Sequence, residues 1–345
     1  MPRASDRVVI TGMNGFTGPH LARELVARGA TVFGMARSAP AERPVALGAV
    51  ELIRVDLFDR DAVFAHFERI QPDAVFHLAT SRVGSATALV RDNVTLADNV
   101  LAATARLGNR RRRKVLVVGS AAEYGAASGG GLLEDAPLAP LTPYGLSKMV
   151  EVALTRSYWF TAGLETYVAR AFNLVGPGEP ASLVCGAVAS QIAAVEQGAR
   201  EPVVVVGDLA ARRDFVDVRD AVRAYARIVD AGRPGEIYNV CSGIETPIES
   251  VVRALVRRAE VPIHIAVDDA RRRVANVPVC SGNPERMRRL GWEPRLALER
   301  SLQDVLADWR ARYRAGAGAP LEASLTAHAD PRAGVRGWST AGKAS

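Results

Sequence analysis

Short apolar runs alternate with longer amphipathic segments along the first half of the chain. The runs are rich in β-branched residues, which favours buried strands, and the segments between them repeat apolar residues at helical spacing. The predicted strands span residues 7–11, 31–36, 51–55, 73–78, 115–118 and 165–171. The predicted helices follow Gly18 and then span residues 59–70, 89–107 and 143–160, with Asp59 as a candidate N-cap. Such alternation predicts an α/β fold with a doubly wound parallel sheet.

The second half of the chain is less regular. Its pattern predicts helices at residues 183–197, 218–229, 248–259 and 300–313, and a strand at residues 203–206. After Arg314 the sequence is rich in Ala, Gly, Ser and Thr, so we expect a disordered tail over residues 313–345.

Composition is that of a globular protein. The chain has 345 residues, of which 48% are hydrophobic and 23% charged. The N-terminus has no apolar h-region and no apolar run is long enough to cross a bilayer, so we expect neither a signal peptide nor a membrane partner. Cys185, Cys241 and Cys280 are odd in number and lack metal-ligand spacing. This usage predicts reduced thiols in a cytoplasmic protein and no metal site.

A basic run at residues 110–114 stands out in a chain of net charge +7. Such a run can bind nucleic acid, but this one directly follows Gly108 and Asn109, where the pattern predicts a helix end. Cations there meet the negative end of the helix dipole. We therefore expect no nucleic-acid partner.

A glycine-rich turn joins the first strand to the first helix. Gly12, Gly15 and Gly18 are spaced three apart, with Asn14 and Phe16 between them. Gly12 permits a tight turn, Gly15 lets a pyrophosphate approach the backbone N–H groups, and Gly18 lets the helix pack closely on the strand. The arrangement predicts a dinucleotide-binding site.

The carboxyl ends of the next strands supply further candidate cofactor residues, because ligands of such sheets bind at that edge. Arg37 and Ser38 stand at the end of the second strand, where an acidic residue would favour NAD. A guanidinium can bind a 2′-phosphate, so NADP(H) is preferred, with NAD(H) possible. The other candidates are Asp56 and Leu57 after the third strand, and Leu78 and Ala79 after the fourth.

Three residues form a candidate catalytic set. Ser120 ends the fifth strand, and Tyr144 and Lys148 lie four apart on the next helix, so they share one face. A free tyrosine titrates near pH ~10, and an ammonium ion nearby favours the phenolate. Such a pair suits proton transfer to or from an alcohol or sugar oxygen.

In this order the features resemble those of the extended short-chain dehydrogenases/reductases that act on nucleotide-linked sugars. The likeness covers about residues 7–312 and looks strongest to GDP-4-keto-6-deoxy-D-mannose reductases and the related GDP-mannose 4,6-dehydratases. The matching pieces are the glycine turn, His77-Leu78-Ala79, Ser120 through Gly125, Tyr144 with Lys148, Arg170 through Gly178, Val206 through Asp220, Tyr238 through Gly243, and Gly291 through Pro294.

The resemblance implies a role for each matching position. Tyr144 would be the acid/base, Lys148 would hold the nicotinamide ribose, and Ser120 would bond the reacting sugar oxygen. It also implies a dinucleotide-binding domain over residues 1–175, a smaller mixed α/β substrate lobe over 176–312, and a return of residues 205–245 to the main sheet. Substrate contacts would come from Thr80, Ser81, Asn173, Arg213 and Arg273.

Departures from the family pattern narrow the range of reactions that the sequence predicts. The dehydratases carry a carboxylate one or two residues after the serine or threonine, where this chain has Ala121 and Ala122. Glu123 lies one place further on, which argues against dehydration. The loop at residues 80–92, which helps line the sugar pocket in the family, looks shorter than in the reductases and hints at an altered sugar. Asn276 stands where the reductases tend to have a glutamate, so the identity of the nucleoside stays open.

The resulting prediction is an NAD(P)H-dependent reductase of a 4-keto-6-deoxy nucleotide sugar. The alternative is a nucleotide-sugar epimerase that retains its oxidised cofactor and uses the same three residues. A cofactor-sensing regulator is disfavoured, because such proteins usually lack an intact Tyr-x-x-x-Lys. The resemblance also implies a homodimer through a four-helix bundle, built from the helices at 89–107 and 143–160.

Overall fold

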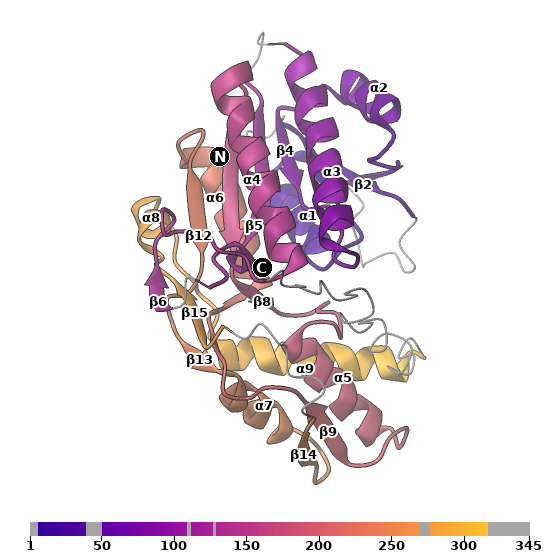
Figure 1. Ribbon diagram of the computed structural model, residues 1–345. Helices are drawn as coiled ribbons and strands as arrows, with labels where there is room; N and C mark the ends of the chain where they lie inside the picture. Colours follow the sequence, from indigo (N-terminus) through magenta and orange to yellow (C-terminus); the bar gives the residue numbers. More distant parts are fainter. Residues whose placement is uncertain (1–5, 39–49, 109–111, 127–128, 269–276, 317–345) are drawn as a thin grey trace, which may run out of the picture.

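A computed structural model of the chain describes residues 6–38, 50–108, 112–126, 129–268 and 277–316. Figure 1 shows a larger lobe built on a central sheet and, below it in that view, a smaller lobe with α5, α7 and α9. The predicted tail beyond residue 316, the nucleoside position 276 and Arg273 all lie outside the described residues.

The central sheet has seven parallel strands, six of which the sequence pattern predicted; the seventh, β12, is the later strand whose return the resemblance implied. Their order is β12-β7-β5-β4-β1-β2-β3. The strands are β1 (Arg7–Thr11), β2 (Thr31–Ala36), β3 (Val50–Arg54), β4 (Ala74–His77), β5 (Lys114–Ser120), β7 (Glu165–Ala171) and β12 (Ile237–Val240). The chain proceeds outward from β1 in both directions, so the turn after β1 lies at the point where strand order reverses, the usual ligand position in such sheets.

Helices cover both faces of this sheet because the apolar residues of each strand alternate between two cores. On one face Val8 and Ile10 pack with α1 (Gly18–Ala27) and α6 (Val218–Ala231). On the other face Val9 packs with α2 (Arg60–Ile70) and α3 (Ala86–Arg106), and α4 (Pro143–Ala162) lies against α3. The parallel strands are thus buried on both sides, which explains their nearly continuous apolar runs.

The smaller lobe has a core of its own. It gathers apolar residues of α5 (Val184–Glu196), α7 (Ile248–Val256) and α9 (Leu298–Arg314). Two parallel strands, β9 (Val203–Val206) and β14 (His264–Val267), pair beside them. The chain returns from this region to the main sheet at β12, which pairs with β7. The limits at residues 175 and 312 stay a prediction.

Several short elements were not expected from the pattern. A four-stranded sheet has the order β13-β10-β15-β6, and β8 and β11 form a separate parallel pair. Their bounds are β6 (Gly129–Leu132), β8 (Asn173–Val175), β10 (Arg212–Arg213), β11 (Phe215–Asp217), β13 (Thr246–Pro247) and β15 (Val279–Gly282), and a short helix, α8 (Glu285–Arg289), follows. Runs of two to four residues are too short to show a period, so tertiary contacts decide their conformation.

The described part of the basic run serves the fold. The guanidinium of Arg113 donates to the carbonyl oxygens of Leu107 and Gly108, directly after α3 ends. Arg112 pairs with Glu165, and the Lys114 ammonium donates to the Val229 carbonyl. The predicted contact between a cation and the helix end is confirmed for Arg113.

The crossover into the smaller lobe is fixed by a buried carboxyl group. Glu179 is 1% exposed, and its Oε1 accepts from the Gly186 N–H at 3.0 Å, while its own carbonyl accepts from the Trp309 indole. Its Oε2 has no hydrogen-bond partner among the described residues. Burial raises the pKa of Glu179 to about 8, despite the backbone N–H groups that favour the carboxylate.

This raised pKa predicts that Glu179→Gln stabilises the fold, and does so more strongly at higher pH. In the unfolded chain this glutamic acid ionises near its ordinary pKa of 4.5, whereas the folded group holds its proton to about 8, so its contribution to stability falls as pH rises between those values. The amide cannot ionise, and we expect the variant to gain roughly 3 kcal/mol over wild type at pH 8 relative to pH 5. Thermal unfolding at both pH values measures this, with exposed Glu201→Gln as control. An equal effect of Glu179→Gln at both pH values would contradict it.

Candidate active site

The glycine turn after β1 has a shape that only small residues permit. Gly12 adopts φ +68°, and a Cβ there would lie 2.7 Å from the backbone nitrogen of Ala79. Its carbonyl accepts from the Gly15 N–H at 2.9 Å, and Gly18 packs directly on the backbone of Met13. The turn therefore presses against the end of β4 and brings α1 close to the sheet.

The start of α1 fits the pyrophosphate of a dinucleotide. Its N-cap residue, Thr17, makes no side-chain cap hydrogen bond, so the first backbone N–H groups of the helix are left without a side-chain acceptor. Asn14 and Gly15 are exposed in the turn ahead of it, and Phe16 is half-buried. Backbone donors at a helix N-terminus, beside glycines, suit an anionic ligand.

The predicted adenosine-side residues lie at the ends of β2 and β3. Arg37 and Ser38 are exposed, and the Asn14 amide donates to the Ser38 carbonyl, which ties the glycine turn to the end of β2. Asp56 is exposed and accepts from the Phe58 N–H. Leu57, by contrast, is buried.

The end of β4 is bound to the end of β1. The Thr11 hydroxyl oxygen accepts from the N–H groups of Leu78 and Ala79, at 3.2 and 3.4 Å. Both of these candidate cofactor residues are half-buried, directly beside Gly12. The structure therefore places the glycine turn and the Leu78–Ala79 segment side by side.

Ser120 ends β5 and caps a single 3-10 turn. Its Oγ accepts from the Ala122 N–H at 3.2 Å, and its own N–H donates to the Glu123 carboxylate at 2.6 Å. Ser120 remains half-buried rather than enclosed. The capping bonds fix the residue at the edge of the sheet where ligands of this fold bind.

Glu123 faces away from that edge, into the core. It is fully buried and forms an ion pair with Arg170 of β7, at 2.9 Å between Nη2 and Oε2. The other carboxylate oxygen accepts from Ser120. Because both oxygens are bound, Glu123 has no free position from which to remove a substrate proton, and Ala121 and Ala122 have no carboxylate.

Tyr144 and Lys148 lie in the first two turns of α4. Thr142 caps the helix by accepting from the Gly145 N–H at 3.0 Å, and Pro143 occupies its first position. Tyr144 is half-buried, whereas Lys148 is 2% exposed. Arg82 places its guanidinium 5.1 Å from the centroid of the Tyr144 ring, a contact that the sequence did not suggest.

The Lys148 ammonium has a buried partner on its own helix. Its Nζ donates to Glu151 Oε2 at 2.6 Å, and Glu151 is fully buried. Burial alone would lower the pKa of Lys148, but the Glu151 carboxylate, with Tyr144 and Glu123, outweighs this and raises it. The lysine is therefore held as a cation next to Tyr144.

Asn93 of α3 is a functional candidate that the sequence reasoning missed. It is 1% exposed, its Oδ1 accepts from the Ser81 N–H at 2.6 Å, and its amide donates to the Ser81 carbonyl and the Ser147 hydroxyl. Ser147 in turn donates to the Tyr144 carbonyl. Asn93 thus fixes the loop after β4 relative to the first turn of α4.

The candidate substrate residues lie at separate points. Thr80 and Ser81 are half-buried in the loop held by Asn93. Asn173 lies on β8, where its amide donates to the Asp214 carbonyl. Arg213 lies on β10 and donates to the carbonyls of Arg212 and Val277. Their joint role in binding a substrate stays a prediction.

Comparisons with known proteins identify the family of this chain. The family model described as "NAD dependent epimerase/dehydratase family" matches residues 8–241. The chain belongs to that family. This confirms the resemblance drawn from the sequence, and with it the expectation of an NAD(P)-dependent enzyme.

Two of the most similar matches are to proteins of Pseudomonas aeruginosa. The chain is 34% identical over 318 residues to a GDP-6-deoxy-D-mannose reductase of Pseudomonas aeruginosa, covering 90% of this chain and 99% of that protein. The solved structure of RMD from Pseudomonas aeruginosa complexed with NADPH superposes with a TM-score of 0.75 at 31% identity, covering 89% and 99% of the two chains.

A third comparison shows that the same fold serves another reaction. The Thermus thermophilus UDP-glucose 4-epimerase in complex with NAD is 25% identical, with a TM-score of 0.76 over 88% of this chain and 99% of that one. The family match therefore does not distinguish reduction from epimerisation.

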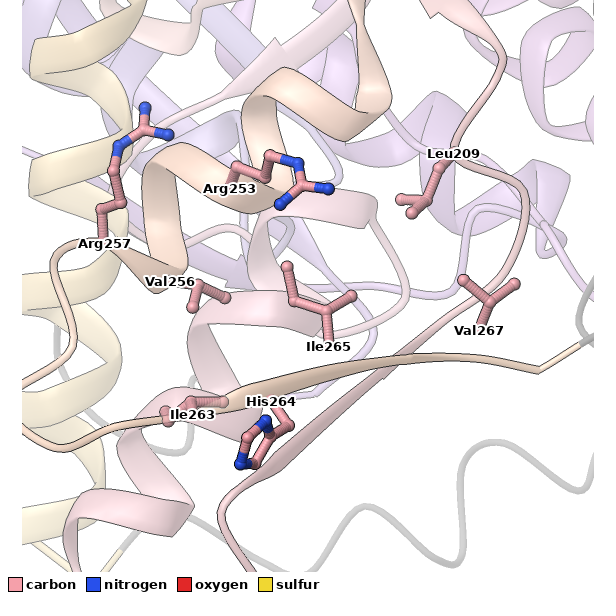
Figure 2. Close-up of a pocket in the computed structure, with 8 residues that line it drawn as sticks. All are labelled: Leu209, Arg253, Val256, Arg257, Ile263, His264, Ile265 and Val267. Carbon is pink, nitrogen blue, oxygen red and sulfur yellow. The ribbon is translucent and has the colours of Figure 1, made fainter.

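One further hollow lies in the smaller lobe. Residues of α7 and β14 line it, together with Leu209 and Ile263 (Figure 2), and its volume is about 540 Å³. Its lining is mainly aliphatic, with Arg253 and Arg257 on α7, and Arg253 is paired with Glu249. It contains none of the candidate cofactor or catalytic residues. Within the described ranges, no helix is long and apolar enough to span a membrane, and no cluster of three metal-ligating side chains occurs.

The Asn93 contacts predict a local loosening in Asn93→Ala. The change leaves the Ser81 backbone groups and the Ser147 hydroxyl without their partner, which costs roughly 1–3 kcal/mol. We expect amide hydrogen exchange at residues 79–85 to speed up at least about 10-fold, because Ser81 loses its acceptor. Mass spectrometry of peptides from this loop measures the change.

Thr104→Ala is the matched control, because its hydroxyl is buried on the same helix and donates to the Val100 carbonyl of that helix. If both variants lose similar stability and the loop exchanges alike in both, Asn93 does not hold the loop in place.

Proposed function

We propose that the protein reduces the C4 keto group of a 4-keto-6-deoxy nucleotide sugar, of the GDP-4-keto-6-deoxy-mannose type. The observation that carries the proposal is a Ser120–Tyr144–Lys148 set with no carboxylate free beside Ser120. The nearest one, Glu123, is committed to Arg170 and the Ser120 N–H. That arrangement supports proton transfer to a sugar oxygen and disfavours dehydration. The similarity to a GDP-6-deoxy-D-mannose reductase over nearly its full length gives independent support.

Each residue of the set has a distinct task. Bound NADPH supplies the hydride that adds to C4. Tyr144 gives its phenolic proton to the oxygen, which would otherwise become an alkoxide, and Ser120 donates a hydrogen bond to the same oxygen. The Lys148 ammonium stabilises the phenolate that remains and would hold the nicotinamide ribose. Within the described residues no hydrogen bond engages the Tyr144 hydroxyl, which leaves it available to a substrate.

The geometry also supports preference for NADPH. Arg37 is exposed at the end of β2, where the ribose of a dinucleotide is bound in this fold, and no acidic side chain of the described residues pairs with it. A guanidinium in that place can bind a 2′-phosphate through charge-assisted hydrogen bonds.

Three further assignments belong to the proposal. Thr80, Ser81, Asn173 and Arg213, with Arg273 outside the described residues, would bind the sugar nucleotide. Two subunits would associate through α3 and α4, which lie side by side and leave Phe160 of α4 71% exposed. The enzyme would act in the cytoplasm.

The alternative function is epimerisation with a retained NAD(P)+. Its support is the resemblance to an NAD-bound UDP-glucose 4-epimerase, since the same three residues can oxidise a sugar alcohol and then reduce the ketone. A purified epimerase would contain tightly bound oxidised cofactor, change a sugar stereocentre and consume no NADPH.

The decisive experiment is incubation of the purified protein with NADPH and GDP-4-keto-6-deoxy-mannose. We expect loss of NADPH absorbance in stoichiometric proportion to the alcohol formed, and we expect Tyr144→Phe to lower kcat about 10²–10⁴-fold because the proton donor is gone. Tyr313→Phe in α9 is the control. Unchanged turnover in Tyr144→Phe would exclude the acid role, and altered sugar without NADPH loss would favour the epimerase.

Cofactor preference yields a separate prediction for Arg37→Ala. We expect the Kd for NADPH to rise about 10-fold, because the 2′-phosphate loses a charge-assisted partner worth roughly 1.5–3 kcal/mol, while the Kd for NADH stays within about twofold. Fluorescence titration measures both constants. Arg106→Ala, which removes the same charge at the exposed end of α3, should leave both unchanged. Equal weakening of the two cofactors in Arg37→Ala would refute the preference.

A further inference from the structure

A row of buried polar side chains runs beneath the catalytic helix. Lys148 Nζ donates to Glu151 Oε2 at 2.6 Å, and Glu151 Oε1 lies 3.9 Å from His77 Nε2 on β4. His77 Nδ1 is 2.9 Å from the Thr11 hydroxyl, at the end of β1. Exposure is at most 2% for all four residues. The row therefore connects the catalytic lysine to the strand that ends at Gly12.

The hydrogen bonds of Thr11 determine the state of His77. The Thr11 oxygen already accepts from the Leu78 and Ala79 N–H groups, so its own proton is directed to His77 Nδ1. The neutral ring then carries its proton on Nε2, the atom that faces Glu151. Burial, with a contribution from Lys148, lowers the pKa of His77 to about 3, in agreement with a neutral ring.

His77 Nε2 and Glu151 Oε1 face one another, and neither has a hydrogen-bond partner among the described residues. A donor is thus directed at a carboxylate oxygen across a gap of 3.9 Å. At that distance the two atoms make no direct hydrogen bond, so the carboxylate is held by its other oxygen, which accepts from Lys148.

The charges around Glu151 are few. On its own helix Glu151 lies next to Lys148, with Tyr144 one turn further away, and on β4 it lies next to neutral His77. The negative charge of Glu123 in the 3-10 turn also acts on it, and that charge is paired with Arg170 of β7. Burial raises the pKa of Glu151 to about 7, although Lys148 favours the carboxylate. The ammonium and the carboxylate therefore depend on one another for their charge.

We propose that Glu151 is a positioning residue of the reaction, whose carboxylate holds the Lys148 ammonium in place and keeps it charged inside the core. It acts only through Lys148. The effect on turnover rests on the proposed function, whereas the effect on cofactor binding rests only on the family's use of this lysine.

Removing the Glu151 carboxylate should lower the pH at which activity is lost, for two reasons. A buried ammonium without its counter-ion releases its proton more readily, so Lys148 becomes neutral at a lower pH. Where Lys148 stays charged, its field on Tyr144 is no longer offset by Glu151, and the phenolate forms at a lower pH. Reduction needs both a protonated Tyr144 and a charged Lys148. Both effects therefore move the fall in activity at alkaline pH to lower pH.

The test compares Glu151→Gln, Glu151→Asp and wild type across pH 5.5–9.5. For Glu151→Gln we expect the alkaline limb of kcat/KM to move down by at least about one pH unit, with more than about 10-fold loss at pH 8 and substantial recovery near pH 6. The Kd for NADPH should rise with pH over the same range. Glu151→Asp retains the charge and should restore much of the wild-type profile. Glu249→Gln on the exposed face of α7 is the control.

A double-mutant cycle keeps the test valid if Glu151→Gln is unstable. If Glu151 acts through Lys148, adding Glu151→Gln to Lys148→Met should change neither kcat/KM nor NADPH affinity further. Additive losses would overturn the proposal. So would a Glu151→Gln profile that coincides with wild type, or a lower Tm and active fraction without a shift of the limb. If wild type fails to reduce the sugar, the proposed function fails, and NADPH binding still tests Glu151.

Discussion

A charged ammonium held inside the protein core is the constraint on which the catalytic half of this molecule depends. Lys148 is 2% exposed, so its charge survives only because Glu151, equally buried, lies 2.6 Å away. Paired charges in a core are costly to desolvate and persist where their partners are fixed. The pair lies within α4, and the packing of this helix on α3, β5 and β7 is what buries it. The proposed role of Lys148 therefore depends on the correct packing of this helix.

The parallel sheet meets that requirement by bringing its strand ends to one edge. Thr11, His77 and Ser120 end β1, β4 and β5, which are neighbours in the sheet. Each makes contacts that link one strand end to another segment: Thr11 to the residues after β4, and Ser120 to Glu123 and through it to β7. The same edge thus supports the glycine turn, the candidate acid/base pair and the buried row beneath it.

The sequence predicted those parts of the fold whose signal is local. Periodicity placed the main strands and helices, and the glycine spacing predicted a turn that Gly12, at φ +68°, indeed adopts. Glu151 was not predicted as part of the site because a glutamate three residues after a lysine looks like a solvated pair on a helix surface. Asn93 was not predicted because an asparagine within a helical pattern shows no partner. Burial and long-range partners decide both cases, and neither can be read from spacing. The short strands of the smaller lobe were missed for the same reason.

The position of the glutamate in the 3-10 turn at residues 121–123 supports the proposed reduction over dehydration. A carboxylate at position 121 or 122 would be the dehydratase pattern, but the acidic residue stands at 123, where the 3-10 turn directs it toward the sheet. There it meets Arg170, which also bonds the Tyr124 hydroxyl and the Glu134 carbonyl, so the carboxylate is enclosed by a buried network. A shift of one residue thus converts a potential base into a structural ion pair. This leaves Ser120, Tyr144 and Lys148 for the proposed transfer of a proton to or from a sugar oxygen.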